Sequence, residues 1–338
     1  MTTAPPLVVI PGRLVEEVLR DAHAEARQMV EDVYVQSFQE RLVNPESLFL
    51  RPAPEARERV IALPAYVPEP TPAMGIKWIA SFPENLSAGL PRASATIVLN
   101  DVATGFPVAL LEGARISGFR TALSALVGAN ALGDGSRRAV KFAVLGTGYI
   151  ADTTVRAFLE DGWQWDEGAV FDLSPDRAQD FVDRLGTNGA DPRLGVATTA
   201  EEALAGADLV LLATTAVTPH IGDLSMLAPH ATVLHMSLRD LTPAALAGAD
   251  HVVDDVSHAL RERTSLALAV EDGTVPRAEI HAVGELLVGG ARRTPGRKAV
   301  YAPFGLGSLD IALGRLVLDR SRHLDGALTV EDFSGIAG

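Results

Sequence analysis

The pattern of apolar and polar positions changes near residue 139. Before that point, apolar residues recur at helical spacing from about residue 12 to 42 and predict one amphipathic helix. Frequent prolines disfavour a long helix between residues 51 and 72. Four apolar segments without helices between them then predict an antiparallel meander. They are residues 59–67, 75–82, 93–101 and 106–112.

An Ala/Leu-rich helix is expected over residues 116–132, followed by a short glycine-containing linker. From residue 139 to about 254, short apolar strands alternate with helices, a rhythm that predicts βαβ units and a parallel sheet. The expected strands are residues 140–146, 168–174, 207–215, 231–237 and 251–255. Residues 298–321 predict a final strand, a glycine turn and a helix that returns to the first domain.

A glycine turn follows the first of these parallel strands. Gly146, Gly148 and Ala151 form G-x-G-x-x-A, and the next strand ends in Asp172. This context predicts a dinucleotide site, because the glycines let the backbone approach a pyrophosphate at a helix N-terminus. Asp172 would accept bonds from ribose hydroxyls and repel a 2′-phosphate, which favours NAD over NADP. The alternative is a tight turn without ligand and an Asp172 that only caps a loop.

The second half of the chain offers further candidates. Thr214 and Thr215 stand where a loop usually passes over the cofactor, although they would equally suit a turn cap. Asp240 follows a strand at the edge where ligands bind, so it is a candidate base or ammonium partner. It would also suit the N-cap of the next helix. Three histidines lack metal-ligand spacing and are expected to be structural, so no metal site is predicted: His235, His258 and His281.

Composition limits the partners. The formal net charge of −14 argues against nucleic acid and anionic membrane surfaces. No apolar run is long enough to cross a bilayer, and no secretory signal is visible. The chain has no cysteine, which excludes thiol chemistry and fits a cytoplasmic enzyme.

Four cations of the first domain stand in or beside apolar segments. They are Arg51, Lys77, Arg92 and Arg120. A charge in such a place is costly unless it is paired or bound to a ligand. We therefore expect a pocket for a small-molecule substrate with several carboxylates, against the alternative of four unrelated surface or salt-bridged cations.

These motifs together resemble the ornithine cyclodeaminase/μ-crystallin family over nearly the whole chain. The resemblance rests on "GIKWIASFPENLSAGLPRASATIVLND", "TGFPVALLEGARISGFRTALSA", "VLGTGYIA" and "SLRDL". "SLFLRP", "IALPA", "VVDDVSH" and "PFGLG" are similar to the branch that makes 2,3-diaminopropionate.

The resemblance implies the architecture. An α/β protein is expected, with a Rossmann-type parallel sheet domain at residues 137–304. This domain is inserted in an α+β substrate-binding and dimerisation domain, which comprises residues 1–133 and is completed by residues 305–338. Members of the family are typically homodimers.

Site residues are also carried over by motif. Asp240 and Lys77 are expected to be catalytic, and Lys77, Arg120, Arg51 and Arg92 to bind substrate. The expected cofactor contacts are Gly146, Thr147, Gly148, Tyr149, Ile150, Asp172, Thr214, Thr215, Thr121 and Ser237.

The branch implies NAD-dependent oxidation of N-(1-amino-1-carboxyl-2-ethyl)-glutamate to L-2,3-diaminopropionate and 2-oxoglutarate. In this branch, 2,3-diaminopropionate is a building block of siderophores and peptide antibiotics. Three alternatives stay open: ornithine cyclodeamination, ketimine reduction or alanine dehydrogenation, and a non-catalytic ligand-binding protein like some μ-crystallins.

Overall fold

The computed structural model describes residues 4–186 and 193–335 and divides the chain into two compact units. Unit 1 comprises Met1–Arg120 and Leu306–Gly338, and unit 2 comprises Thr121–Gly305. In the described part of the chain, no helix is sufficiently long and apolar to span a membrane.

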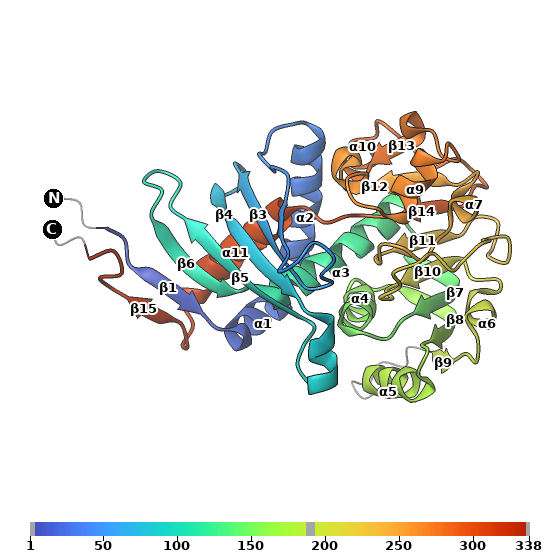
Figure 1. The fold of residues 1–338 in the computed structure, drawn as a ribbon, viewed down its shortest axis with the longest axis horizontal. Coiled ribbons are helices and arrows are strands. Elements are labelled where there is room, and N and C mark those ends of the chain that lie inside the picture. The colour runs from blue at the N-terminus through green and yellow to red at the C-terminus, as the bar shows by residue number, and fades with distance from the viewer. Residues whose placement is uncertain (1–3, 187–192, 336–338) are drawn as a thin grey trace. The chain divides into compact units, whose positions relative to one another are not determined.

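Unit 1 is built on a seven-stranded sheet (Figure 1) in the order β15-β1-β6-β5-β4-β3-β2. The pairing is antiparallel except between β1 and β6, so the predicted antiparallel meander is confirmed. Its strands are β1 Leu7–Ile10, β2 Leu48–Leu50, β3 Arg59–Val67, β4 Ala73–Ser81, β5 Ala93–Asn100, β6 Pro107–Glu112 and β15 Leu328–Val330. Its helices are α1 Gly12–Asp21, α2 His23–Phe38, the 3₁₀ helix η1 Pro83–Ala88 and α11 Gly307–Ser321.

The two faces of this sheet differ. Leu63, Lys77 and Ile97 lie in register on one face. Helix α11 packs closely there, since a Cβ added at Gly307 would lie 3.0 Å from Leu63 Cβ. Trp78 is on the opposite face and is 44 % exposed. Helix α11 therefore packs in the core of unit 1, although it comes 195 residues after β6 in sequence (307 − 112).

The single helix predicted for residues 12–42 is wrong, because the segment forms α1 and α2 and ends at Phe38. The break is at Ala22, where φ is −106° and ψ is 18°. Ala22 N still donates to Val18 O, and Ala26 N donates to Ala22 O. Only Ala22 departs from helical geometry, and the backbone hydrogen bonds continue on both sides of it. The apolar positions therefore keep their helical spacing across the break, and the sequence pattern could not reveal it.

Helix α3, Gly113–Leu132, starts three residues before the predicted 116. The carboxylate of Glu112 explains this, because Oε1 accepts from Ala114 N at 2.9 Å and Oε2 from Arg115 N at 3.1 Å. A side chain that satisfies free N–H groups extends a helix at its start. The boundary between the units falls within this helix, between Arg120 and Thr121.

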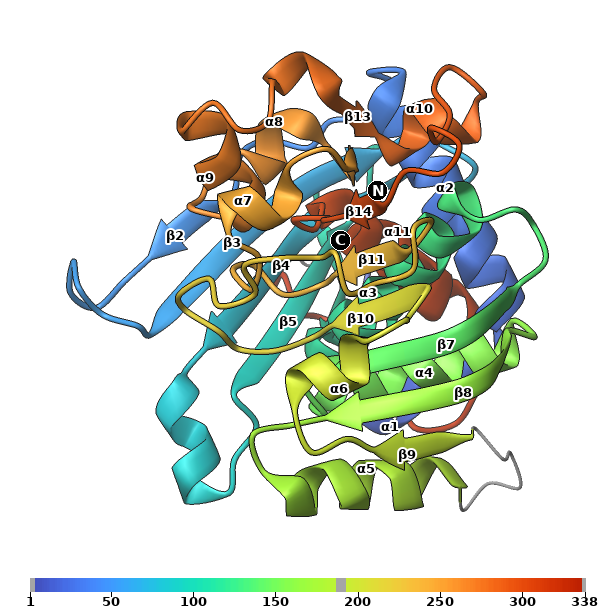
Figure 2. The same cartoon turned by 90° about the vertical axis from the view of Figure 1, so that its right-hand side faces the viewer.

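Unit 2 holds an eight-stranded parallel sheet, in the order β13-β12-β14-β11-β10-β7-β8-β9, as the alternating pattern predicted. Figure 2 shows its strands with neighbouring helices. The strands are β7 Arg138–Leu145, β8 Gln164–Phe171, β9 Leu194–Val196, β10 Leu209–Leu212, β11 Thr232–His235, β12 Asp250–Val253, β13 Ile280–Ala282 and β14 Ala299–Tyr301. The helices are α4 Tyr149–Glu160, α5 Pro175–Gly186, α6 Ala200–Leu204, α7 Pro243–Leu246, α8 Val256–Ala259, α9 Ser265–Glu271, η2 Arg277–Glu279 and α10 Val283–Leu287.

Candidate functional site

The glycine turn lies where β7 ends and α4 begins. Gly146 has φ +87°, and a Cβ there would lie 2.6 Å from Ala213 O. Only glycine fits such a position without strain. Gly148 precedes α4 in an extended conformation, and a Cβ added to it would meet nothing within 4 Å. The space beside Gly148 and the N-terminus of α4 suit the approach of a pyrophosphate.

Asp172 ties this turn to the end of β8. Its Oδ2 accepts from Thr147 N at 3.0 Å and Thr147 Oγ1 at 2.7 Å, and its Oδ1 accepts from Ser174 N at 3.1 Å. Burial tends to raise the pKa of Asp172, but these hydrogen bonds outweigh it and lower the pKa below the ordinary value. Asp172 therefore is ionised and does cap its loop, and the contact with a ribose stays a prediction.

Asp240 lies at the centre of a hydrogen-bonded network within unit 2. The hydroxyls of Thr214 and Ser237 donate to its carboxylate, and His235 Nε2 lies 3.2 Å from Oδ2. The residue is 0 % exposed. The predicted cofactor contacts Thr214 and Ser237 are thus brought to the predicted catalytic aspartate, together with a histidine that the sequence suggested was structural.

This hydrogen-bonded network stabilises the ionised form of Asp240. Burial would raise its pKa, but the hydrogen bonds from His235, Ser237 and Thr214 lower it below the ordinary value. The alternative that Asp240 caps the next helix is wrong. The N-cap of α7 is Thr242, whose Oγ1 accepts from Ala245 N at 3.3 Å.

These groups share one edge of the parallel sheet. Gly146, Asp172, Thr214 and Ser237 follow the carboxyl ends of β7, β8, β10 and β11. The strand order reverses between β7 and β10, and open parallel sheets bind ligands at such a switch point. A Cβ at Gly146 would lie 3.1 Å from Thr214 Cα, so the glycine turn and the Asp240 network are adjacent.

Two of the predicted substrate-binding cations meet inside unit 1. Lys77 Nζ lies 2.5 Å from Asp310 Oδ2, and Arg120 Nε lies 3.4 Å from Asp310 Oδ1. Ser117 Oγ accepts from Lys77 Nζ at 3.2 Å and from an Arg120 nitrogen at 3.4 Å. Lys77 is 1 % exposed, and burial lowers its pKa to about 8 against the opposing effect of Asp310. The cluster is salt-bridged in part, but two cations share one carboxylate.

Arg51 and Arg92 lie apart from this cluster, at one end of strands β2 to β5. Arg51 donates to Ala56 O at 3.4 Å and stacks over the Phe49 ring at 5.7 Å. Burial, and then the nearby Arg57 guanidinium, lowers the pKa of Arg92. Within residues 4–186 and 193–335, neither Arg51 nor Arg92 has a carboxylate partner.

The remaining predicted contacts are less constrained. Tyr149 is 56 % exposed at the first turn of α4, and Ile150 follows it half-buried. Thr215 is exposed after β10, and Thr121 is half-buried in α3. Thr214 Oγ1 also accepts from Ala216 N at 3.1 Å, so the turn-cap role exists and its cofactor contact stays a prediction.

The other two histidines lie elsewhere in unit 2. His281 Nδ1 lies 3.0 Å from Glu285 Oε2, and His258 lies in α8, where its backbone N–H donates to Asp255.

Sequence reasoning missed Asp310 and Ser117. Asp310 lies in the apolar stretch "GSLDIALG", where a lone acid signals a buried cationic partner. That signal was available. Ser117 has no comparable pattern, because it lies among small residues of α3.

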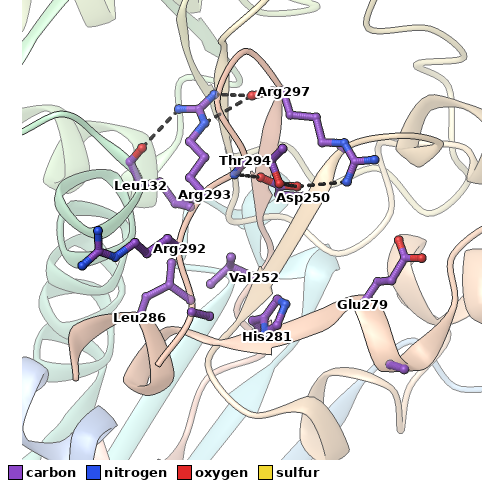
Figure 3. Close-up of a pocket in the computed structure, with 13 residues that line it drawn as sticks. Leu132, Asp250, Val252, Glu279, His281, Leu286, Arg292, Arg293, Thr294 and Arg297 are labelled. Carbon is purple, nitrogen blue, oxygen red and sulfur yellow. Dashed lines mark hydrogen bonds and ion pairs between the residues drawn. The ribbon is translucent and has the colours of Figure 1, made fainter. Parts of the chain in front are cut away.

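A cavity of about 270 Å³ lies at the opposite edge of the parallel sheet, near the amino ends of β12 and β13 (Figure 3). Two of its arginines are engaged in hydrogen bonds or ion pairs. Arg297 pairs with Asp250 at 3.3 Å, and Arg293 donates to the carbonyls of Leu132 and Ala231. These bonds tie the segment after α10 to the end of α3, to the residue before β11 and to the start of β12. Because these side chains serve to hold unit 2 together, this cavity is not assigned to the cofactor or the substrate.

Comparison with known proteins identifies the family of this chain. The model of the ornithine cyclodeaminase/mu-crystallin family matches residues 16–324. The chain belongs to this family. A similar curated relative is N-((2S)-2-amino-2-carboxyethyl)-L-glutamate dehydrogenase of Staphylococcus aureus, 28 % identical over 311 residues, which covers 86 % of this chain and 90 % of the relative. The predicted family is confirmed.

Two solved structures of this family's fold are similar over nearly the whole chain. One is Delta(1)-pyrroline-2-carboxylate reductase of Thermococcus litoralis with NADH and L-proline, with a TM-score of 0.86, 21 % identity and coverage of 95 % and 99 % of the two chains. The other is an archaeal alanine dehydrogenase dimer with bound NAD, with a TM-score of 0.84, 22 % identity and coverage of 97 % and 100 %. The predicted fold class is confirmed.

Proposed function

We propose that this protein oxidatively cleaves N-(1-amino-1-carboxyl-2-ethyl)-glutamate with NAD, giving L-2,3-diaminopropionate, 2-oxoglutarate and NADH. The observation that carries the proposal is the excess of cations in unit 1. Lys77 and Arg120 share one carboxylate, and Arg51 and Arg92 have no carboxylate partner in the described part of the chain.

The charge count suits a substrate with several carboxylates. Lys77, Arg120 and Asp310 sum to one positive charge, which one substrate carboxylate would neutralise. Arg51 and Arg92 remain available for the other substrate carboxylates, because a guanidinium group can bind a carboxylate through two parallel hydrogen bonds. The proposed amine has three carboxylates, whereas ornithine and alanine have one each.

An NAD-dependent enzyme is confirmed at the level of the family, because similar structures hold NAD or NADH and the named relatives are dehydrogenases and reductases. The residues fit this cofactor. Gly146 and Gly148 leave space for a pyrophosphate, and the ionised Asp172 suits ribose hydroxyls rather than a 2′-phosphate. Bound NAD would accept a hydride from the glutamyl Cα of the substrate.

The side chains then have separate tasks. Lys77 and Arg120 bind a substrate carboxylate and orient the amine. Asp240 is fully buried, so we assign it to proton handling through the half-buried hydroxyls of Thr214 and Ser237. Such a relay would take a proton during oxidation of the amine or during attack of water on the resulting imine. Hydrolysis of this imine consumes one water molecule and releases 2-oxoglutarate and L-2,3-diaminopropionate.

We also propose that the enzyme is a homodimer that uses the open face of the sheet in unit 1. Leu48 and Trp78 lie in register on this face and are 64 % and 44 % exposed. Ile76 and Val98 extend the apolar row and are half-buried. Such a row on a monomer marks an interaction surface, and the similar archaeal alanine dehydrogenase is a dimer.

The expected pathway role is the supply of diaminopropionate for siderophores or peptide natural products, in the cytoplasm. The chain has no cysteine, which is compatible with a reducing compartment.

Ornithine cyclodeamination is the second candidate, since it would use the same hydride chemistry but return the hydride. Incubation with NAD separates the two. The proposed amine should give NADH continuously, whereas a cyclodeaminase would convert ornithine to proline with no net NADH. Absence of NADH with the amine would contradict the proposal.

A further inference from the structure

Asp310 connects three elements of unit 1 beneath the sheet. It lies in the first turn of α11, is 0 % exposed, and contacts Lys77 of β4 and Arg120 of α3. Each carboxylate oxygen faces a different cation, at 2.5 Å from Lys77 Nζ and 3.4 Å from Arg120 Nε. The two cations would otherwise repel each other.

We propose that Asp310 is a positioning residue, which holds the Lys77 ammonium and the Arg120 guanidinium together as one receptor for a substrate carboxylate. The inference rests on the proposed function in one respect, that these two cations bind a carboxylate. It adds that the receptor depends on an anion from the C-terminal helix. Ser117 completes the arrangement, because its hydroxyl oxygen accepts from both cations.

The charges around Lys77 explain why the anion is needed. The charged groups that face Lys77 are Asp310 on α11 and Arg120 on α3, while its register partners Leu63 and Ile97 are apolar. Burial is the largest influence on the pKa of Lys77, and Arg120 lowers it further. Asp310 alone opposes them and leaves the pKa at about 8. Without Asp310, Lys77 would lose its proton near neutral pH.

The consequence is a pH dependence with a defined sign. A carboxylate binds the protonated amine, so affinity should fall as the pH rises through about 8. Above the pKa the protonated fraction falls about tenfold per pH unit. Replacement of Asp310 by Asn removes the group that raises the pKa, so the fall should begin at a lower pH.

The experiment measures binding of 2-oxoglutarate to the NADH-loaded enzyme by calorimetry between about pH 6 and 9. For wild type, the affinity should fall above pH 8. For Asp310→Asn, we expect the fall to begin at least one pH unit lower, so that the protonated fraction of Lys77 and the affinity near pH 7.5 drop by about threefold or more. An unchanged pH midpoint in this variant, or wild-type binding without pH dependence, would overturn the proposal.

Two further variants separate positioning from general stability. Asp319→Asn makes the same change on α11 at an ion pair with Arg315, and it should leave the binding curve unchanged. Asp310→Glu keeps the charge, so the pH midpoint should stay while the affinity falls through altered geometry. If Asp310→Asn does not fold, this Glu variant decides, because unchanged affinity and midpoint would contradict positioning.

Failure of the proposed function would look different. No NADH from the amine, together with pH-dependent binding of 2-oxoglutarate that requires Asp310, would reject the reaction and retain the receptor. NADH formation with an Asp310→Asn variant that binds like wild type would retain the reaction and reject the receptor.

Discussion

At the scale of single residues, three buried or half-buried carboxylates determine the charge of the candidate sites. Asp172 and Asp240 are held ionised by hydroxyl and N–H donors in unit 2. Asp310 instead offsets two cations in unit 1. Asp172 and Asp240 therefore contribute fixed negative charges at neutral pH, whereas the role of Asp310 is set by the two cations that it contacts.

The charge of Asp172 should select the cofactor. Asp172→Ala should weaken NAD binding by about tenfold or more, since a hydrogen bond to a charged group contributes roughly 1.5–3 kcal/mol. NADP should lose less, because the variant no longer repels its 2′-phosphate. Fluorescence titration of both cofactors measures this. Asp180→Ala is the matched control, since it removes an exposed carboxylate from α5 and should leave both affinities unchanged. Equal losses for both cofactors in Asp172→Ala would refute the ribose contact.

Residue identity and spacing were sufficient to select Asp172, Asp240, Lys77 and Arg120 as candidates. They could not show what each touches, because contacts such as Lys77 with Asp310 join positions 233 residues apart. The same limit applied to His235. Its contact with Asp240 depends on the loop conformation after β11, which side-chain spacing does not define.

At the scale of elements, the turn between β7 and α4 makes different demands on its two glycines. Gly146 needs its positive φ and the space beside Ala213 O, so it is required by the fold. Gly148 needs neither, because its φ is −77° and its Cβ direction is open. The sequence motif alone does not distinguish these roles.

This difference gives a test of the nucleotide site. Gly146→Ala should lower the free energy of unfolding by about 1–2 kcal/mol or more, through the left-handed conformation and the clash. Gly148→Ala should leave the melting temperature unchanged but weaken NAD binding, because its methyl group would occupy the path of the pyrophosphate. Calorimetry and cofactor titration report the two effects. Wild-type affinity for NAD in Gly148→Ala would contradict a pyrophosphate at this turn.

Elements with strong periodicity were predicted well, including the meander of unit 1 and the main parallel strands of unit 2. The short strands β1, β2, β9, β13 and β15 were not predicted. Length alone does not explain this, because β10, β11, β12 and β14 are equally short but lie in apolar segments that the sequence analysis identified. The start of α3 was displaced for a local reason, the capping carboxylate of Glu112.

At the scale of the whole molecule, the open apolar face of unit 1 bears on assembly. Trp78→Glu should convert the expected dimer to a monomer, because a charge would be buried in the contact. Size-exclusion chromatography with light scattering measures the mass. Val140→Glu is the control, since Val140 is 64 % exposed in unit 2 and its change should leave the mass unaltered. A Trp78→Glu variant with the wild-type dimer mass would exclude this face, and a monomeric wild type would exclude the dimer.

The proposed reaction is a net oxidative cleavage of a secondary amine with several carboxylates. The most direct measurement is quantitative mass spectrometry of the products from N-(1-amino-1-carboxyl-2-ethyl)-glutamate and NAD, with NADH counted by absorbance. We predict equal amounts of L-2,3-diaminopropionate, 2-oxoglutarate and NADH. Unchanged amine, alongside conversion of ornithine to proline without net NADH, would contradict this reaction.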